Sequence, residues 1–145
     1  MDSIDNLKLL DFYKIIKDLL IDLNNTFSDK VEPIISNNRD FGIILNYERG
    51  ENGDENEEDN TLEKRELLNS TNNIFHYCKK VFPERFFDIL YQNEEIFSNE
   101  TNTEFLPGLN FSDLYFDTTS IQTKETLWKY LQLILFSIIT TIDNK

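Results

Sequence analysis

The chain holds a single histidine and a single cysteine, His76 and Cys78, which could form a nucleophile with its base or part of a metal site. They lie two residues apart in a segment with helical periodicity, so their side chains point in widely different directions. A zinc site needs three or four protein ligands, and the chain has no second His or Cys to supply them. We therefore expect Cys78 to be a buried core residue and His76 to lie in solvent or at the boundary of the core.

Glu84 and Asp88 are spaced i,i+4, which puts both carboxylates on one face of a helix. Such a pair is the minimum for acid/base catalysis or for a cation site, but no second cluster can be placed opposite it. The acidic run within 48–60 lacks the alternating oxygen ligands and terminal Glu of a calcium loop, and the 4 glycines form no phosphate-binding loop. The sequence thus predicts no catalytic, cofactor-binding or metal-binding residue.

The charge balance narrows the range of partners. With 27 acidic against 14 basic residues, the formal net charge is -13, which repels phosphate backbones and anionic lipid surfaces. The small basic cluster of Lys79, Lys80 and Arg85 is narrower than the Lys/Arg stripe of a typical nucleic-acid-binding face. We expect neither direct nucleic-acid binding nor membrane binding.

Export signals are not evident in the sequence. A lone cysteine allows no internal disulfide framework, and the first residues, Met1 to Asp5, lack the basic and apolar regions of a signal peptide. The apolar run 131–142 is shorter than the roughly 20 residues that a bilayer requires, and so predicts a core helix. We expect an intracellular protein, whose Asn-x-Ser/Thr sequons are chance products of an Asn-rich composition. These sequons begin at Asn24, Asn69, Asn99 and Asn110.

Apolar periodicity predicts the elements of the first half of the chain. Steps of three and four over 7–27 indicate an amphipathic helix, which Ser28 and Asp29 should break. A short helical turn around Pro33 follows. The run 41–47 is ambiguous between a buried strand and a helical turn. The segment 48–60 has no large apolar residue to offset its ordering entropy, so we expect a mobile acidic loop.

The second half predicts further helices. One over 61–82 follows a capping-box spacing from Asn60 to Glu63, and Pro83 then starts a helix that is apolar on most sides and should be buried. Residues 98–110 read as a polar loop with a Pro-Gly turn, a short helical turn covers 111–116, and Thr123 can cap a last helix that ends near Ile142. The overall expectation is an all-α single domain over 1–145, with about four main helices and a core supplied by a 39% hydrophobic composition.

The aromatic residues have two possible roles. Trp128 and the Phe cluster could anchor a partner, because aromatic residues dominate interface hot spots, but at helical spacing they are more often core. The last helix is apolar beyond one face, so we expect it either to be surrounded by other helices or to be partly covered by another molecule. The apolar residues outside its main face are Tyr130, Leu133, Phe136 and Ile139.

The second half of the chain contains the segments CKKVFPERFFDILYQNEEIF, from Cys78 to Phe97, and KETLWKYLQLILF, from Lys124 to Phe136, with Glu104 to Gly108 between them. These segments resemble a poorly characterised protein family encoded by nucleocytoplasmic large DNA viruses of algae and protists. The resemblance covers about half of the chain and implies a viral setting, in which such segments lie in an N-terminal domain. It carries no catalytic motif.

The leading functional hypothesis is a non-enzymatic protein-interaction or structural module of a large DNA virus. Its partner would be a viral or host protein, or a second copy, and its location the host cytoplasm, the viral factory or the virion. One alternative is an acidic decoy that occupies a basic nucleic-acid-binding surface of another protein. The other is a small enzyme of unrecognised type built around Glu84, Asp88 or Cys78.

Overall fold

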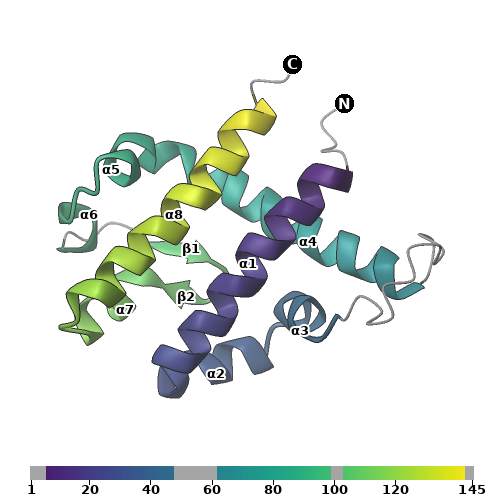
Figure 1. The fold of residues 1–145 in the computed structure, drawn as a ribbon, viewed down its shortest axis with the longest axis horizontal. Coiled ribbons are helices and arrows are strands. Elements are labelled where there is room, and N and C mark those ends of the chain that lie inside the picture. The colour runs from purple at the N-terminus through teal and green to yellow at the C-terminus, as the bar shows by residue number, and fades with distance from the viewer. Residues whose placement is uncertain (1–5, 48–61, 99–102, 143–145) are drawn as a thin grey trace. The chain divides into compact units, whose positions relative to one another are not determined.

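The computed structural model describes residues 6–47, 62–98 and 103–142 (Figure 1). These residues are predominantly α-helical, which confirms the all-α class. The acidic segment 48–60 and the cap expected at Asn60 lie outside them. The chain's internal contacts define two compact units, Met1–Asn73 and Ile74–Lys145, which are described separately. The single domain predicted over 1–145 stays a prediction.

The first unit is built on α1 (Asn6–Thr26), the helix predicted from periodicity. The side chains at steps of three and four are at most 5% exposed, because they form the apolar stripe that packs into the core. The helix ends at Thr26, and Phe27 breaks it because its backbone leaves the helical region. Ser28 and Asp29, where the break was expected, are already the first residues of α2, so the break comes one residue earlier than predicted. The stripe consists of Leu9, Phe12, Ile16, Leu19 and Leu23.

The two short helices that follow are α2 (Ser28–Ser36) and α3 (Arg39–Asn46), and both pack on α1. The ambiguous run 41–47 is therefore helical except for Tyr47. The Asn38 side chain caps α3 by accepting a hydrogen bond from the Phe41 backbone N–H at 3.0 Å. Phe41 and Ile44, three residues apart, supply the buried face of this helix.

Gly42 lies inside α3 without a packing reason to be glycine. A Cβ built on it meets no atom within 4 Å, and its backbone is helical. We expect Gly42→Ala to raise the free energy of unfolding by about 0.5–1 kcal/mol, because alanine loses less conformational entropy than glycine in a helix. Chemical denaturation followed by circular dichroism measures this change, and a destabilised variant would show that the site is crowded.

The helix α4 (Leu62–Val81) confirms the one predicted over 61–82, and the boundary between the units falls within it. In the second unit it is followed by three short helical segments, η1 (Pro83–Arg85), α5 (Phe86–Leu90) and α6 (Glu95–Ser98). A hairpin of β1 (Glu104–Leu106) and β2 (Leu109–Asn110), which the sequence did not predict, comes next. The predicted Pro-Gly turn does connect them, with Gly108 at a φ of 79°. The Tyr77 hydroxyl of α4 fixes the hairpin by donating to the Glu104 backbone oxygen at 2.8 Å.

The second unit is completed by α7 (Phe111–Asp117), the turn predicted over 111–116, and by α8 (Ile121–Ile142). The cap of α8 differs from the expected Thr123, since the Ser120 hydroxyl accepts from the Thr123 backbone N–H at 3.1 Å. One broad face of α8 is buried, as expected of a core helix, and no described helix is long and apolar enough to cross a membrane. That face comprises Leu127, Trp128, Leu131, Ile134, Leu135 and Ile138.

Candidate functional site

The His76 and Cys78 side chains do not form a joint site. Cys78 is fully buried, and its burial raises the pKa of the thiol well above its usual range. The thiol points at the Phe105 backbone oxygen, with the Sγ atom 3.7 Å away, whereas His76 is exposed. The expectation that Cys78 belongs to the core is confirmed, and this thiol is sheltered from solution reagents.

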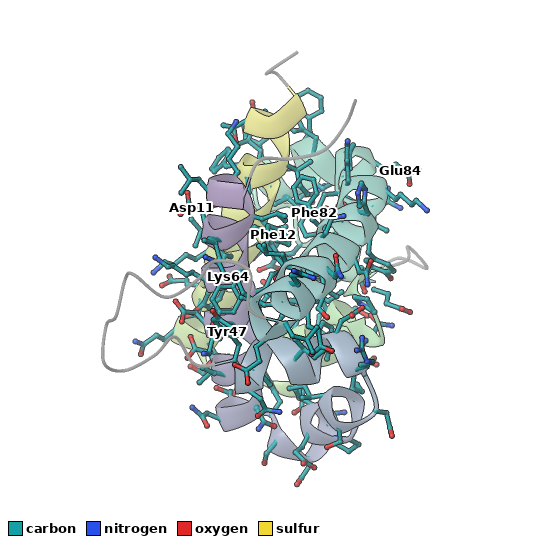
Figure 2. The ribbon with its side chains drawn as sticks, turned by 90° about the vertical axis from the view of Figure 1, so that its right-hand side faces the viewer. Asp11, Phe12, Tyr47, Lys64, Phe82 and Glu84 are labelled. Atoms are coloured by element: carbon teal, nitrogen blue, oxygen red, sulfur yellow. The ribbon has the colours of Figure 1, made fainter. Side chains whose placement is uncertain are left out.

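The Glu84 and Asp88 carboxylates lie at the start of the second unit's short helices. Glu84 belongs to the 3-10 turn η1 (Pro83–Arg85) and is exposed, while Asp88 belongs to α5 (Phe86–Leu90) and accepts from the Asn93 side-chain amide at 3.0 Å. Figure 2 shows Glu84 directed away from the protein, in contrast to the buried Phe82 before it. Among the described residues, no group of three or more His, Cys, Asp or Glu side chains is arranged to hold a metal ion.

A cavity of about 430 Å³ lies in the first unit. The carboxylate of Glu66 on its wall pairs with Arg39 at 3.6 Å, an exposed contact of small energetic value. The Tyr47 backbone oxygen accepts from the Lys17 ammonium at 3.1 Å. These two contacts hold residues of the cavity wall in place, and neither suggests a catalytic role. The cavity is lined by Ile43, Asn46, Tyr47, Glu63 and Glu66.

The most unusual surface of the second unit is a pair of exposed aromatic rings on α5. Phe87 is 67% and Tyr91 72% exposed, so the expectation of a buried helix after Pro83 is wrong. The helix is only five residues long and packs on α8 with one side, which leaves Ile89 as its fully buried residue. By contrast, Trp128 is 4% exposed, which confirms its expected place in the core.

The end of α5 holds Tyr91 in place through a Schellman motif. The Gln92 N–H donates to the Ile89 oxygen at 3.2 Å, and the Asn93 N–H donates to the Asp88 oxygen at 2.8 Å. Gln92 has a φ of 55°, the left-handed conformation that this motif requires at the residue after the cap. A glutamine in that conformation stores strain directly beside the exposed Tyr91.

Gln92→Gly tests this account of the helix end. Glycine adopts a positive φ without the steric cost of a Cβ, so we expect the free energy of unfolding to rise by about 0.5–1 kcal/mol. Thermal denaturation followed by circular dichroism measures the shift. Gln92→Ala is the matched control, because it keeps the Cβ and should give no comparable gain.

Two further apolar side chains are exposed on α8, which packs on α5 (Figure 1). The Gln132 side chain joins the two helices by donating to the Ile89 and Leu90 backbone oxygens at 3.1 and 3.2 Å. Phe136, one turn beyond Gln132, is 47% exposed, and Leu133 is 37% exposed. We call Phe87, Tyr91, Leu133 and Phe136 the α5–α8 apolar surface.

Sequence reasoning identified the α8 part of this surface and missed the α5 part. The apolar excess of the last helix indicates Leu133 and Phe136, whereas Phe87 and Tyr91 belong to the helix after Pro83 that the sequence predicts to be buried. The polar pair Gln92 and Asn93 is the sequence feature that could have indicated this exposure, because it ends the helix after so few residues that its other faces stay uncovered. Comparison with protein-family models, curated proteins and solved structures found no match to this chain.

Proposed function

We propose that this chain is a non-enzymatic protein-interaction module of a large DNA virus and that it binds its partner through the α5–α8 apolar surface. The observation that carries the proposal is the exposed pair of rings on α5. Phe87 and Tyr91 stack with their planes 5° apart and their centroids at 6.3 Å. The largest exposed apolar patch of a monomeric protein, typically about 300–600 Å², is often a functional interaction site.

The rings are held ready for a partner. Phe86 contacts the Phe87 ring edge-on at a centroid distance of 4.8 Å, and the Schellman motif fixes the backbone at Tyr91. Aromatic side chains have few rotatable bonds, so ordering them on binding costs little entropy. Such preorganisation converts more of the buried area into affinity.

The exposed area sets the expected strength of binding. Phe and Tyr side chains bury about 150–250 Å² each, so the exposed parts of the two rings amount to roughly 200–350 Å². Covering that area contributes about 5–9 kcal/mol, and association costs about 4–15 kcal/mol. The ring pair alone therefore supports a weak complex, and a stable one needs further contacts from α8 and from charged groups.

The viral setting is supported by the sequence resemblance. All four residues of the α5–α8 apolar surface lie within the two segments that carry it, Cys78 to Phe97 and Lys124 to Phe136. The proposal that the module is not an enzyme is supported by the surroundings of two residues that could have been catalytic. Cys78 is buried as a thiol, and Asp88 is hydrogen-bonded to Asn93 in a helix-end motif.

Quantitative co-purification from a lysate of infected host cells tests the proposal. The variant Phe87→Ala/Tyr91→Ala removes the ring pair, and Phe116→Ala removes a ring that is 59% exposed on α7, outside the surface. We expect a protein partner to be enriched with the wild type and with Phe116→Ala, and to fall at least tenfold with the double variant, as for hot-spot residues.

Light scattering on the same proteins separates a foreign partner from self-association. Folding of the double variant is checked by circular dichroism, and exposed rings should contribute little to stability. The proposal would be contradicted if the wild-type protein is strictly monomeric and co-purifies with no protein whose recovery falls in the double variant.

A further inference from the structure

Tyr91 is the most accessible tyrosine of the chain. All 6 tyrosines lie among the described residues, and Tyr91 is the only exposed one, at 72%. Tyr115 is buried, and the Tyr77 hydroxyl donates to the Glu104 backbone oxygen. The others, Tyr13, Tyr47 and Tyr130, are half-buried. The Tyr91 hydroxyl is therefore the one that a modifying enzyme reaches most readily.

The residues on either side of Tyr91 in the sequence are acidic. Asp88 precedes it by three residues, and Glu94 and Glu95 follow it by three and four. No Lys or Arg occurs over 86–123, so the basic cluster lies before this stretch. Protein kinases select their substrates partly by such charge patterns. This pattern suits a tyrosine kinase that prefers acidic flanks.

The backbone around Tyr91 is held by one strained turn. The helix α5 has five residues, and the Tyr91 N–H closes it by donating to the Phe87 oxygen at 3.0 Å. Gln92, the next residue, has the strained φ of 55°. Opening the turn releases this strain, which offsets part of the cost of the broken hydrogen bonds. The segment can therefore extend into a kinase active site.

We infer that Tyr91 is a phosphorylation site and that its phosphate releases the partner of the α5–α8 apolar surface. A protein tyrosine kinase transfers the γ-phosphoryl group of ATP to the Tyr91 Oη atom. The bond from the γ-phosphorus to the bridging oxygen breaks as the new O–P bond forms, ADP leaves, and the hydroxyl proton passes to the kinase's catalytic carboxylate. The release, but not the acceptor site, rests on the proposed function.

The phosphate changes the chemistry of the ring pair. It adds a charge of about −1.5 to −2 at pH 7 to a ring that the partner would otherwise cover. Covering the ring would then strip water from the phosphate, and a partner that matches apolar rings offers no cation in exchange. We therefore expect phosphorylation to weaken the complex.

Incubation of the full chain with a purified tyrosine kinase of acidic-flank preference, Mg²⁺ and ATP tests the acceptor site. Tandem mass spectrometry of the digested chain gives the rate of modification at each tyrosine. Tyr91 should react about tenfold or more faster than the others, because buried groups react only when the structure opens. Similar rates at all tyrosines, or an undiminished total rate in Tyr91→Phe, would overturn the acceptor site.

A matched pair of variants at Gln92 tests the strained turn. Gln92→Gly relieves the strain of the folded turn, so the extended form becomes rarer and modification should slow about two- to fivefold. Gln92→Ala also lacks the glutamine side chain but keeps the Cβ and its strain, so its rate should stay within about twofold of the wild type. Equal slowing in both variants would overturn the role of the turn.

The release is measured on one preparation that is untreated, phosphorylated, or phosphorylated and then treated with a tyrosine phosphatase. Each sample is used for co-purification from the lysate of infected host cells, and phosphatase inhibitors protect the phosphorylated one. Recovery of the ring-dependent partner should fall about tenfold or more on phosphorylation and return after phosphatase treatment. Kinase-treated Tyr91→Phe should show no fall relative to its own untreated sample.

The outcomes separate this inference from the proposed function. A partner recovered equally with and without the phosphate would overturn the release and leave the interaction surface standing. A protein recovered only by the phosphorylated chain would also overturn the release, because the phosphate would then recruit a partner. If no recovered protein depends on the ring pair, the proposed function and the release both fail, while the rates at the tyrosines still decide the acceptor site.

Discussion

Trp128→Ala is expected to lower the free energy of unfolding by about 3–5 kcal/mol, a large part of the roughly 5–15 kcal/mol that a domain possesses. Trp128 is 4% exposed and lies in an aromatic cluster with Phe97 and Tyr115, at centroid distances of 5.2 and 6.0 Å. Truncation removes these contacts and leaves a cavity, because the structure around a truncated side chain relaxes only partially. The unfolding midpoint should fall by about 10–20 °C.

Circular dichroism is the appropriate measurement, because Trp128 is the single tryptophan and its removal abolishes the fluorescence signal. Trp128→Phe is the matched control, since it keeps a ring and should lose about 1–2 kcal/mol. If the alanine variant loses less than the phenylalanine variant, then the ring is not a core element.

Alkaline pH is expected to destabilise the protein through Cys78. The unfolded thiol has a pKa near 9.0, whereas burial keeps the native thiol protonated far above that pH. A group whose native pKa is raised gives its full stability below the unfolded pKa and loses it as pH rises above that value. The loss amounts to about 1.4 kcal/mol per pH unit, or about 2–3 kcal/mol between pH 9 and 11.

Cys78→Ala isolates this effect, because alanine does not titrate. Its stability should be lower at pH 7, where a small cavity is the main change, but should fall less steeply between pH 9 and 11. Burial and Glu104 also raise the pKa of Tyr77 to about 12. Tyr77 therefore adds its own loss of stability above pH 10, and this loss remains in Cys78→Ala. Parallel slopes for the wild type and Cys78→Ala would show that the thiol reaches solvent in the folded state.

The long helices could be predicted from sequence because their pattern repeats over many turns. The apolar stripe of α1 and the broad face of α8 each extend over about 20 residues, long enough for a 3.6-residue period to be unmistakable. The eight-residue α3 offers only two turns, so its pattern also fits a buried strand. Capping by Asn38 and packing of Phe41 and Ile44 decide its structure.

The candidate surface was only half predictable for a related reason. Hydrophobicity shows that a residue can be buried, but burial also requires another element to cover it. Phe87 and Ile89 look equivalent in sequence, yet α8 covers Ile89 and leaves Phe87 exposed. The left-handed conformation of Gln92 ends α5 after five residues. So short a helix packs on α8 with one face and leaves its other faces exposed.

The small hairpin bears on aggregation. Unpaired strand edges are templates on which further chains add as β-structure, and this chain is 13% aromatic. The strands β1 and β2 have only 3 and 2 residues, so each edge is too short to template such growth. In the part of the chain that the structure describes, fibril growth through a strand edge would therefore have to begin from unfolded chains, and substitutions that stabilise the helices should slow it.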